Sequence, residues 1–177
     1  MLKSTLIVLA ISLSFFSCTE VVFEAPQPPE GTNLTVIPDA LVGDFSFVVL
    51  NEQEAIHITN EYFDGDEGKK YLSDSLILRK MGNKYVVNQL INKEGDTNGK
   101  WSVFIFEEKG CGFLKATTFM ISEDEYLPAF TEAYDAIQVG GGQEKQLIIN
   151  PKDLATFEQL TKDREASLAI ILEKIEE

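Results

Sequence analysis

Apolar and polar residues alternate with a period of two along most of the stretch from residue 41 to residue 120. Because successive side chains of a β-strand point to opposite faces, this period predicts strands that direct one side at a core. Six strands are predicted, at residues 44–50, 54–59, 76–78, 85–87, 101–106 and 113–120. Strands spaced by about ten residues are typical of an antiparallel meander, which takes the form of a curled sheet, a barrel or a sandwich.

The segment from Trp101 to Phe106 differs from the others because both of its faces are apolar, so it is predicted to be a central strand. Just before it, Asn98-Gly99 is a strong signal for a hairpin turn. If the sheet closes into a barrel, apolar residues of the first and fifth predicted strands are the candidates for lining a ligand cavity. If it does not, the same residues fill a dry core. These residues are Phe45, Phe47, Trp101, Val103 and Ile105.

The last third of the chain changes to a helical period. Ser122 to Glu125 has the spacing of a capping box, and the apolar residues after it predict a helix near residues 123–138. Asn150 and Pro151 fit an N-cap followed by proline at the first helical position, which predicts a second helix near residues 151–176. The expected fold is therefore mainly β with C-terminal helices (α+β), as an antiparallel meander sheet or a lipocalin-like barrel, in one domain over residues 41–177.

Residues 1–17 have the features of a secretory signal peptide. Lys3 supplies a positive charge, and the apolar stretch after it is too short to span a membrane as a permanent helix. The stretch ends at Ser17-Cys18, which resembles the lipobox of bacterial lipoproteins. In that family the cysteine thiol receives a diacylglycerol, and cleavage makes the cysteine the first residue. The resemblance implies lipidation at Cys18; an ordinary secretory signal that is cleaved elsewhere is the alternative.

Residues 18–40 begin with this cysteine and contain three prolines within four positions, from Pro26 to Pro29. Pro-rich segments are extended and semi-rigid. The sequence therefore predicts that residues 18–40 form a spacer, which would hold the domain away from the bilayer.

Several short segments together resemble a group of lipoproteins from the Bacteroidetes. They are Ser17-Cys18, Phe23–Pro28, Ile37–Phe45, Val87-Asn88 and Trp101-Ser102-Val103. The resemblance implies no reaction. In lipoproteins of enterobacteria, an aspartate directly after the lipidated cysteine is associated with retention in the inner membrane. This chain has Thr19 at that position, which favours a location at the outer membrane.

Two further resemblances concern single sites. Asp74-Ser75-Leu76 is similar to the Asp-Ser/Thr-aliphatic motif that is glycosylated in periplasmic and surface proteins of the Bacteroidetes, which makes Ser75 a candidate glycosylation site. Gly43-Asp44-Phe45 is similar to the Gly-x-Trp segment of lipocalins, which implies a small barrel with an apolar cavity.

The charge balance excludes some partners. The chain has 15 Lys and Arg residues against 29 Asp and Glu residues, which gives a formal net charge of -14. Binding to a phosphate backbone needs a cationic face, so no nucleic-acid partner is expected. The expected partners are a membrane, reached through the lipid on Cys18, and a protein of the cell envelope.

Residues that support catalysis or metal binding are sparse. His57 is the only histidine, and a lipidated Cys18 leaves Cys111 as the only thiol, so neither a catalytic triad nor a zinc site is expected. The acidic segment Asp64–Gly68 is not an EF-hand loop, because Gly68 and Ser75 stand at positions where an EF-hand has ligands. The segment is predicted to be a hairpin tip, and a weak cation site on the surface is the alternative. No enzyme activity, cofactor or metal is expected.

The sequence thus predicts a lipid-anchored protein of the cell envelope, at the outer membrane, with a non-catalytic binding or protein-interaction role. The alternative is a lipocalin-like carrier of a small apolar ligand. An apolar cavity would favour the carrier, whereas a filled core with an exposed apolar patch would favour the interaction module.

Overall fold

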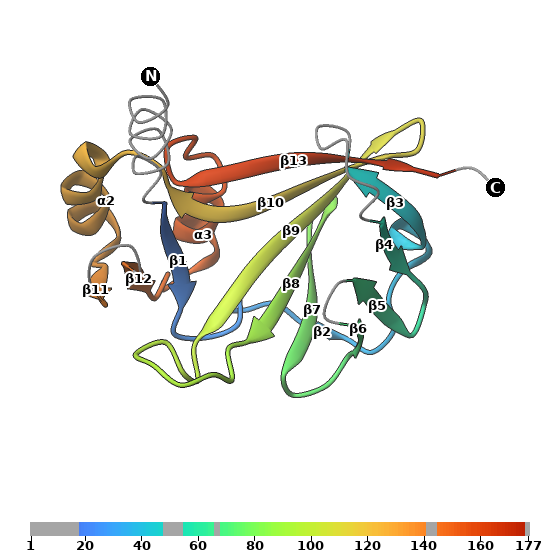
Figure 1. Cartoon of the computed structure of the whole chain (residues 1–177), viewed down its shortest axis with the longest axis horizontal. Coiled ribbons are helices and arrows are strands. Elements are labelled where there is room, and N and C mark those ends of the chain that lie inside the picture. The colour runs from blue at the N-terminus through green and yellow to red at the C-terminus, as the bar shows by residue number, and fades with distance from the viewer. Residues whose placement is uncertain (1–17, 48–54, 66–67, 141–144, 176–177) are drawn as a thin grey trace, which may run out of the picture.

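The hairpin formed by β9 (Trp101–Gly110) and β10 (Phe113–Ile121) is the centre of the computed structural model, and the other elements are arranged around it (Figure 1). The structure describes residues 18–47, 55–65, 68–140 and 145–175. The fold is mainly β, with 49% of these residues in strands and a curled antiparallel half-barrel sheet, which confirms the predicted α+β class.

The other strands are β1 (Thr19–Phe23), β2 (Asn33–Leu34), β3 (Gly43–Phe47), β4 (Ala55–Ile58), β5 (Tyr62–Gly65), β6 (Gly68–Tyr71), β7 (Leu76–Met81), β8 (Lys84–Leu90), β11 (Ile137–Val139), β12 (Gln146–Ile149) and β13 (Ser167–Lys174). The helices are α2 (Leu127–Tyr134) and α3 (Leu154–Leu160), and 3-10 turns occur at Asp39–Leu41 and Asp124–Tyr126. Within the described ranges, neither helix is long and apolar enough to cross a membrane.

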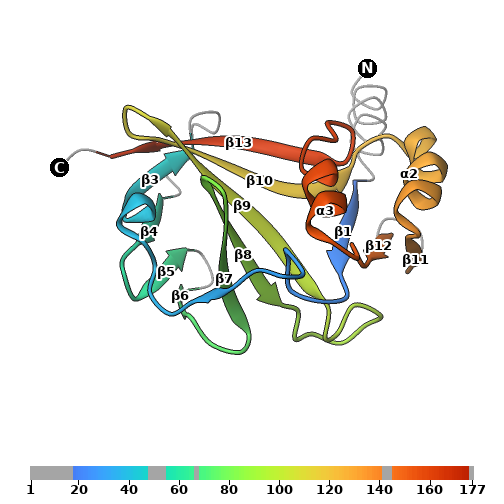
Figure 2. The same cartoon turned by 180° about the vertical axis from the view of Figure 1, so that it is seen from behind.

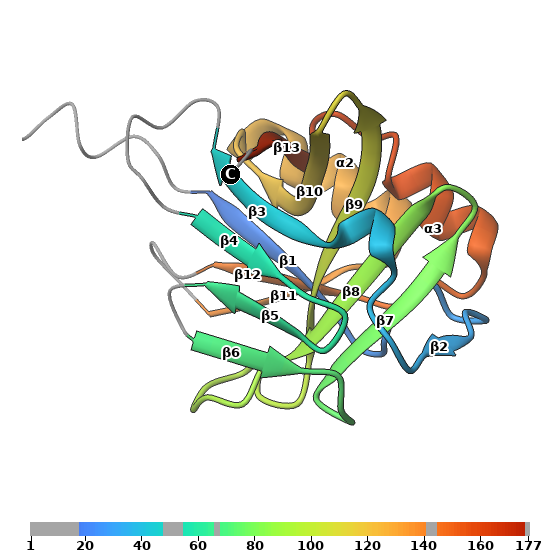
Figure 3. The ribbon, with the colours of Figure 1, turned by 90° about the vertical axis from the view of Figure 1, so that its right-hand side faces the viewer.

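All of these strands belong to one sheet, in the order β2-β7-β8-β9-β1-β10-β13-β3-β4-β5-β6, with β12 beside β1 and β11 beside β12. The pairs are antiparallel except for β1 and β12, which are parallel. Figure 3 shows how the sheet curls, so that β3 to β6 lie opposite β7 to β9. In the described part of the chain, β2 and β6 end the order without pairing with each other, so the barrel stays open along one side.

The sheet has a core on each face. On the face that α2 and α3 cover (Figure 2), the rings of Phe23, Phe119 and Phe157 pack together with centroids 5.3 to 6.0 Å apart. Inside the half-barrel, a second core contains buried residues such as Leu78 and Leu114. The long strands β9 and β10 contribute to both cores, because their two faces are both apolar.

β1 lies within the sheet, which corrects the predicted spacer over residues 18–40. It pairs with β12 on one side and with β10 and β9 on the other, and the side chains of Val22 and Phe23 are fully buried. Strands in parallel pairs are usually covered on both faces, and their sequences are then continuously apolar. The run Val21-Val22-Phe23 is therefore a core strand.

The Pro-rich stretch after β1 is also held against the sheet. The guanidinium Nη1 of Arg79 donates hydrogen bonds to the carbonyl oxygens of Pro26 and Pro28, each at 2.6 Å. Gln27, between the two prolines, is fully buried. Prolines stiffen an extended segment both when it is a free spacer and when it packs against a sheet. The proline content alone therefore does not distinguish a spacer from a packed segment.

The helix predicted near residues 151–176 is helical only in its first half. α3 ends at Leu160, and residues 167–174 form β13, which pairs with β10 over seven residue pairs and with β3 over three. Tertiary pairing outweighs the helical spacing here, since β-branched residues such as Ile170 and Ile171 also suit a strand. The helix predicted near residues 123–138 is present as α2, preceded by a 3-10 turn.

Tyr126 fastens the start of α2 to the turn before β13. Its hydroxyl donates to Asp163 Oδ2 at 2.6 Å, and this hydrogen bond, with some burial, raises the pKa of Tyr126 to about 12. Burial also raises the pKa of Tyr134, and the nearby charge of Asp163 adds to the rise. The hydrogen bond between Tyr126 and Asp163 therefore holds the start of α2 in place as long as the phenol of Tyr126 is protonated.

Candidate functional site

The inside of the half-barrel contains a pocket of about 490 Å³. Its walls come from β4, β5 and β6 on one side and from β7, β8 and β9 on the other. The lining residues are Ala55, Ile56, Phe63, Asp64, Gly65, Gly68, Lys70, Leu76, Val87, Gln89, Ser102, Phe104 and Phe106. Ligand pockets have volumes of roughly 300–1,000 Å³, so this pocket, which we call the barrel pocket, can hold a small molecule.

Aromatic and aliphatic side chains form the middle of the barrel pocket. Phe63 of β5 stacks on Phe106 of β9, with ring centroids 6.5 Å apart and planes inclined by 17°. Phe104 and Val87 extend the apolar wall along β9 and β8, which pair at these two residues. Apolar walls of this kind favour a ligand that is itself largely apolar, because binding removes both surfaces from water.

A few polar side chains line the walls of the barrel pocket. On the wall formed by β5 and β6, Lys70 pairs with Phe63 and shares its face, whereas the side chain of Asp64 is on the opposite face of β5. At one end of the wall formed by β8 and β9, Gln89 and Ser102 lie opposite each other. Ser102 Oγ donates to Glu20 Oε1 of β1 at 3.4 Å, so this end of the pocket reaches the first strand of the described chain.

A second hollow, of about 510 Å³, lies on the other side of Glu20 and is mainly polar. We call it the polar pocket. Its walls come from β1, the loop between β8 and β9, and the start of β12 (residues Cys18, Glu20, Lys93, Glu94, Gly95, Asp96, Thr97, Gly140, Lys145 and Gln146). Gln146 Nε2 donates to Glu20 Oε2 at 2.6 Å. Glu20 therefore accepts a hydrogen bond from a residue of each pocket.

The structure separates the five residues predicted to line a cavity. Trp101, Val103 and Ile105 are buried on the helix-covered face of β9, in the core with Phe119. Phe45 is buried in the core inside the half-barrel and does not line the barrel pocket. The side chain of Phe47 lies outside the described residues, although its backbone belongs to β3.

The even-numbered residues of β9 line the barrel pocket instead. Ser102, Phe104 and Phe106 share one face, and the strand period makes this face the alternative to the odd-numbered one. The sequence shows that both faces of this strand are apolar, and only the placement of the helices tells which one faces the barrel interior. The sequence does not indicate that Phe63 lines a pocket, because the residues of β5 and β6 show no clear alternation of apolar and polar side chains.

The other sequence-predicted sites are scattered over the molecule. Cys18 is half-buried immediately before β1, and Ser75 is exposed in the turn before β7, where its hydroxyl lies 3.0 Å from that of Ser73. Asp64 belongs to the β5–β6 hairpin, as predicted, but residues 66–67 at its tip lie outside the described residues. Among the residues that the structure describes, no group of three or more His, Cys, Asp and Glu side chains could hold a metal ion.

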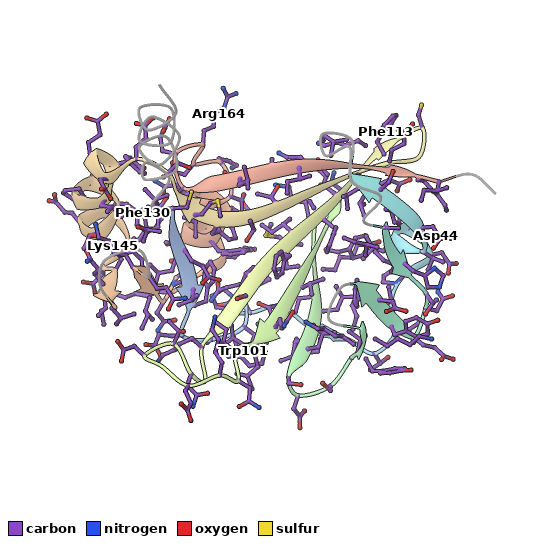
Figure 4. All side chains as sticks on the ribbon, in the orientation of Figure 1. Asp44, Trp101, Phe113, Phe130, Lys145 and Arg164 are labelled. Carbon is purple, nitrogen blue, oxygen red and sulfur yellow. The ribbon has the colours of Figure 1, made fainter. Side chains whose placement is uncertain are left out.

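His57 and Cys111 lie on different elements and are not paired. His57 Nδ1 contacts Asp44 Oδ1 across β3 and β4, and its ring lies 5.9 Å from that of Tyr62. Cys111 is exposed at the tip of the β9–β10 hairpin, with a left-handed φ of 52°. Figure 4 shows that Asp44 and Lys145, which lines the polar pocket, lie at opposite ends of the molecule. The histidine pair is therefore remote from the polar pocket.

Comparison of the chain with protein-family models, with curated proteins and with solved structures finds no match in any of the three.

Proposed function

We propose that this protein is a lipid-anchored, non-catalytic binding protein of the bacterial cell envelope, and that the barrel pocket binds a small apolar ligand. The pocket carries this proposal, because most of its lining side chains are aromatic or aliphatic, and Lys70, Gln89 and Ser102 add a few polar groups. Such a site combines apolar contact area with a few polar groups that orient a ligand.

The proposed anchor is a lipid on Cys18, at the outer membrane. It is supported by the Ser17-Cys18 sequence at the end of an apolar N-terminal stretch. Each buried CH₂ of an acyl chain contributes about 0.8 kcal/mol to membrane binding, so stable attachment requires more than one chain or a second signal. A diacylglycerol meets this requirement without a basic patch, which suits a protein with a net charge of -14.

A protein partner in the envelope is the second candidate. Ile171 in β13 and Ile175 just after it are 36% and 46% exposed. Exposed apolar side chains at a strand that borders an open surface are candidates for contact with another protein. Crosslinking in intact cells would test it: a reproducible crosslink from this end of β13 to one envelope protein is the supporting outcome.

Binding of the neutral dye N-phenyl-1-naphthylamine, which fluoresces in apolar surroundings, tests the proposed pocket. Gln89→Trp places a large side chain on the pocket wall, and we expect it to weaken dye binding by about tenfold or more. Gln138→Trp makes the same change at an exposed position of β11 and should bind dye like the parent. Equal binding by the two variants, or no binding by the parent, would contradict the proposal.

Partitioning into the detergent phase of a cloud-point extraction tests the anchor. We expect the parent chain to enter the detergent phase and Cys18→Ser to remain in the aqueous phase. Cys111→Ser is the matched control, because it removes the other thiol and leaves Cys18 in place. If parent and Cys18→Ser partition alike, the chain has no lipid at Cys18.

A further inference from the structure

The distance between Cys18 and the folded sheet is one peptide bond. β1 begins at Thr19, which is 1% exposed, and every residue from Val21 to Phe23 is buried. No flexible segment separates the proposed lipid from the domain, because the residue after the cysteine is already paired with β10. A lipid on Cys18 would therefore place this end of the sheet directly at the membrane surface.

Hydrogen bonds of Glu20 link the linings of the two pockets next to this position. Glu20 lies two residues from Cys18, roughly 7 Å along an extended strand. Its carboxylate accepts hydrogen bonds from Ser102, which lines the barrel pocket, and from Gln146, which lines the polar pocket. Cys18 itself lines the polar pocket. The polar pocket is thus the nearer of the two to the proposed anchor, and the apolar barrel pocket leads away from it.

The barrel pocket is mainly apolar and the polar pocket is charged, so together they match a ligand with an apolar chain and a polar head group. The barrel pocket offers Phe63, Phe104 and Phe106 to an apolar chain. The polar pocket is lined by the ammonium groups of Lys93 and Lys145, of which Lys145 also lies 3.5 Å from Asp124 Oδ1, and by three carboxylates, those of Glu20, Glu94 and Asp96. Charges of both signs suit a head group that carries both signs, and the excess of carboxylates disfavours a purely anionic one.

The volume of the barrel pocket limits the apolar part of the ligand. About 490 Å³ lies in the lower part of the range of roughly 300–1,000 Å³ for ligand pockets, which favours one acyl chain over two. We propose that the barrel pocket and the polar pocket together bind a zwitterionic lipid with a single acyl chain, taken directly from the bilayer that holds Cys18. This inference rests on the anchor and on the pocket proposed above.

The first test uses the full-length chain and vesicles of dioleoylphosphatidylcholine that contain 1-palmitoyl-lysophosphatidylcholine. Native mass spectrometry of the recovered protein reads the retained lipid. We expect one lysophospholipid per chain, retention about tenfold lower for Gln89→Trp, and retention unchanged for Gln138→Trp. Dye binding without retained lysophospholipid would overturn this inference and leave the apolar pocket standing, whereas loss of both would remove the pocket as well.

The second test addresses the head group. Lys93→Met removes a cation of the polar pocket, and Lys162→Met removes one from an exposed position in the turn after α3. We expect only Lys93→Met to lower retention of the lysophosphatidylcholine, and we expect the anionic lysophosphatidylglycerol to be retained less by the parent. Equal retention of the two lipids, or equal effects of the two variants, would overturn the zwitterionic assignment.

The third test addresses the source of the lipid. The parent chain, reconstituted in the same vesicles, should load lysophosphatidylcholine faster than Cys18→Ser added from solution. Both chains should still retain lysophosphatidylcholine supplied below its micellar concentration, because the substitution leaves the lining of the barrel pocket unchanged. Equal loading rates would overturn direct transfer from the bilayer.

Discussion

Gln27 and Asn88 lie 61 residues apart in the sequence and exchange two hydrogen bonds in the interior of the protein. The main-chain N–H of Gln27 donates to Asn88 Oδ1 at 2.6 Å, and Asn88 Nδ2 donates to the carbonyl oxygen of Gln27 at 2.9 Å. Both residues are fully buried. One amide side chain on β8 therefore fixes the path of the Pro-rich stretch that follows β1.

Replacement of Asn88 by leucine keeps the size of the side chain and removes its polar atoms. The main-chain N–H and carbonyl of Gln27 then lose these buried partners. Because each unsatisfied buried group costs about 1–3 kcal/mol, we expect Asn88→Leu to lower the free energy of unfolding in urea by about 2–4 kcal/mol. Asn83→Leu, at an exposed position of the turn between β7 and β8, should change it by less than about 0.5 kcal/mol. Similar values for the two variants would contradict the prediction.

Phe157 is the aromatic residue by which α3 contacts the sheet. It is fully buried and its ring lies 6.0 Å from that of Phe23 and 6.0 Å from that of Phe119. Large-to-small substitution of a buried Phe costs about 3–5 kcal/mol, and we expect Phe157→Ala to fall in this range in the same urea measurement. Leu154→Ala, on the same helix but 40% exposed, is the control and should cost below about 1 kcal/mol.

The hydrogen bond between Tyr126 and Asp163 predicts a loss of stability at high pH. The pKa of Tyr126 is raised from 10.0 to about 12 in the folded state, so the stabilisation is fully present below pH 10 and is lost as the pH rises toward 12. Tyr126→Phe should be less stable than the parent at neutral pH and should show a smaller further loss over this interval. Tyr71→Phe, at a 54% exposed position, controls for the removal of a phenol. Parallel pH profiles for the parent and Tyr126→Phe would refute this role.

Ser75 is predicted to carry a glycan in a host from the Bacteroidetes, because it lies in Asp74-Ser75-Leu76 and is exposed. The intact mass of the purified parent should then exceed that of Ser75→Ala by the mass of a glycan, since any lipid on Cys18 is common to the two proteins. Ser73→Ala alters the neighbouring hydroxyl, 3.0 Å away, without changing the motif, and should keep the excess mass. If the masses of the parent and Ser75→Ala differ only by the oxygen atom that the substitution removes, Ser75 carries no glycan.

The sequence predicts the strands best where one period is unambiguous. β3, β4, β7, β8, β9 and β10 lie where the alternation places them. The sequence does not predict β13, because Leu168, Ile171 and Leu172 have a helical spacing. The segment is a strand because it pairs with β10 on one side and with β3 on the other. β5 and β6 were missed because a hairpin with Asp64, Lys69 and Lys70 has few apolar positions.

The candidate site could be predicted in kind but not in its residues. The apolar strand from Trp101 to Phe106 indicates a lining strand, yet the face that lines the barrel pocket depends on where α3 packs. Packing of a helix against one side of a sheet depends on residues far apart in the chain, such as Phe23 and Phe157, whose contact no local pattern reveals. The polar pocket depends equally on β12 lying beside β1, a long-range pairing.

The position of β1 also has a consequence for the order of events during synthesis. Its partners, Ile121 for Thr19 and Ile149 for Phe23, are separated from it by roughly a hundred residues or more, so closing these contacts is a late and slow step of folding. Until the strands β10 and β12 have been made, the segment around Cys18 has no place in a sheet and is open to enzymes that act on the chain. Once β1 has paired, Thr19 is buried and enzymes no longer have free access to the chain beside Cys18. The rate of folding therefore limits the time available for any processing at this end of the protein.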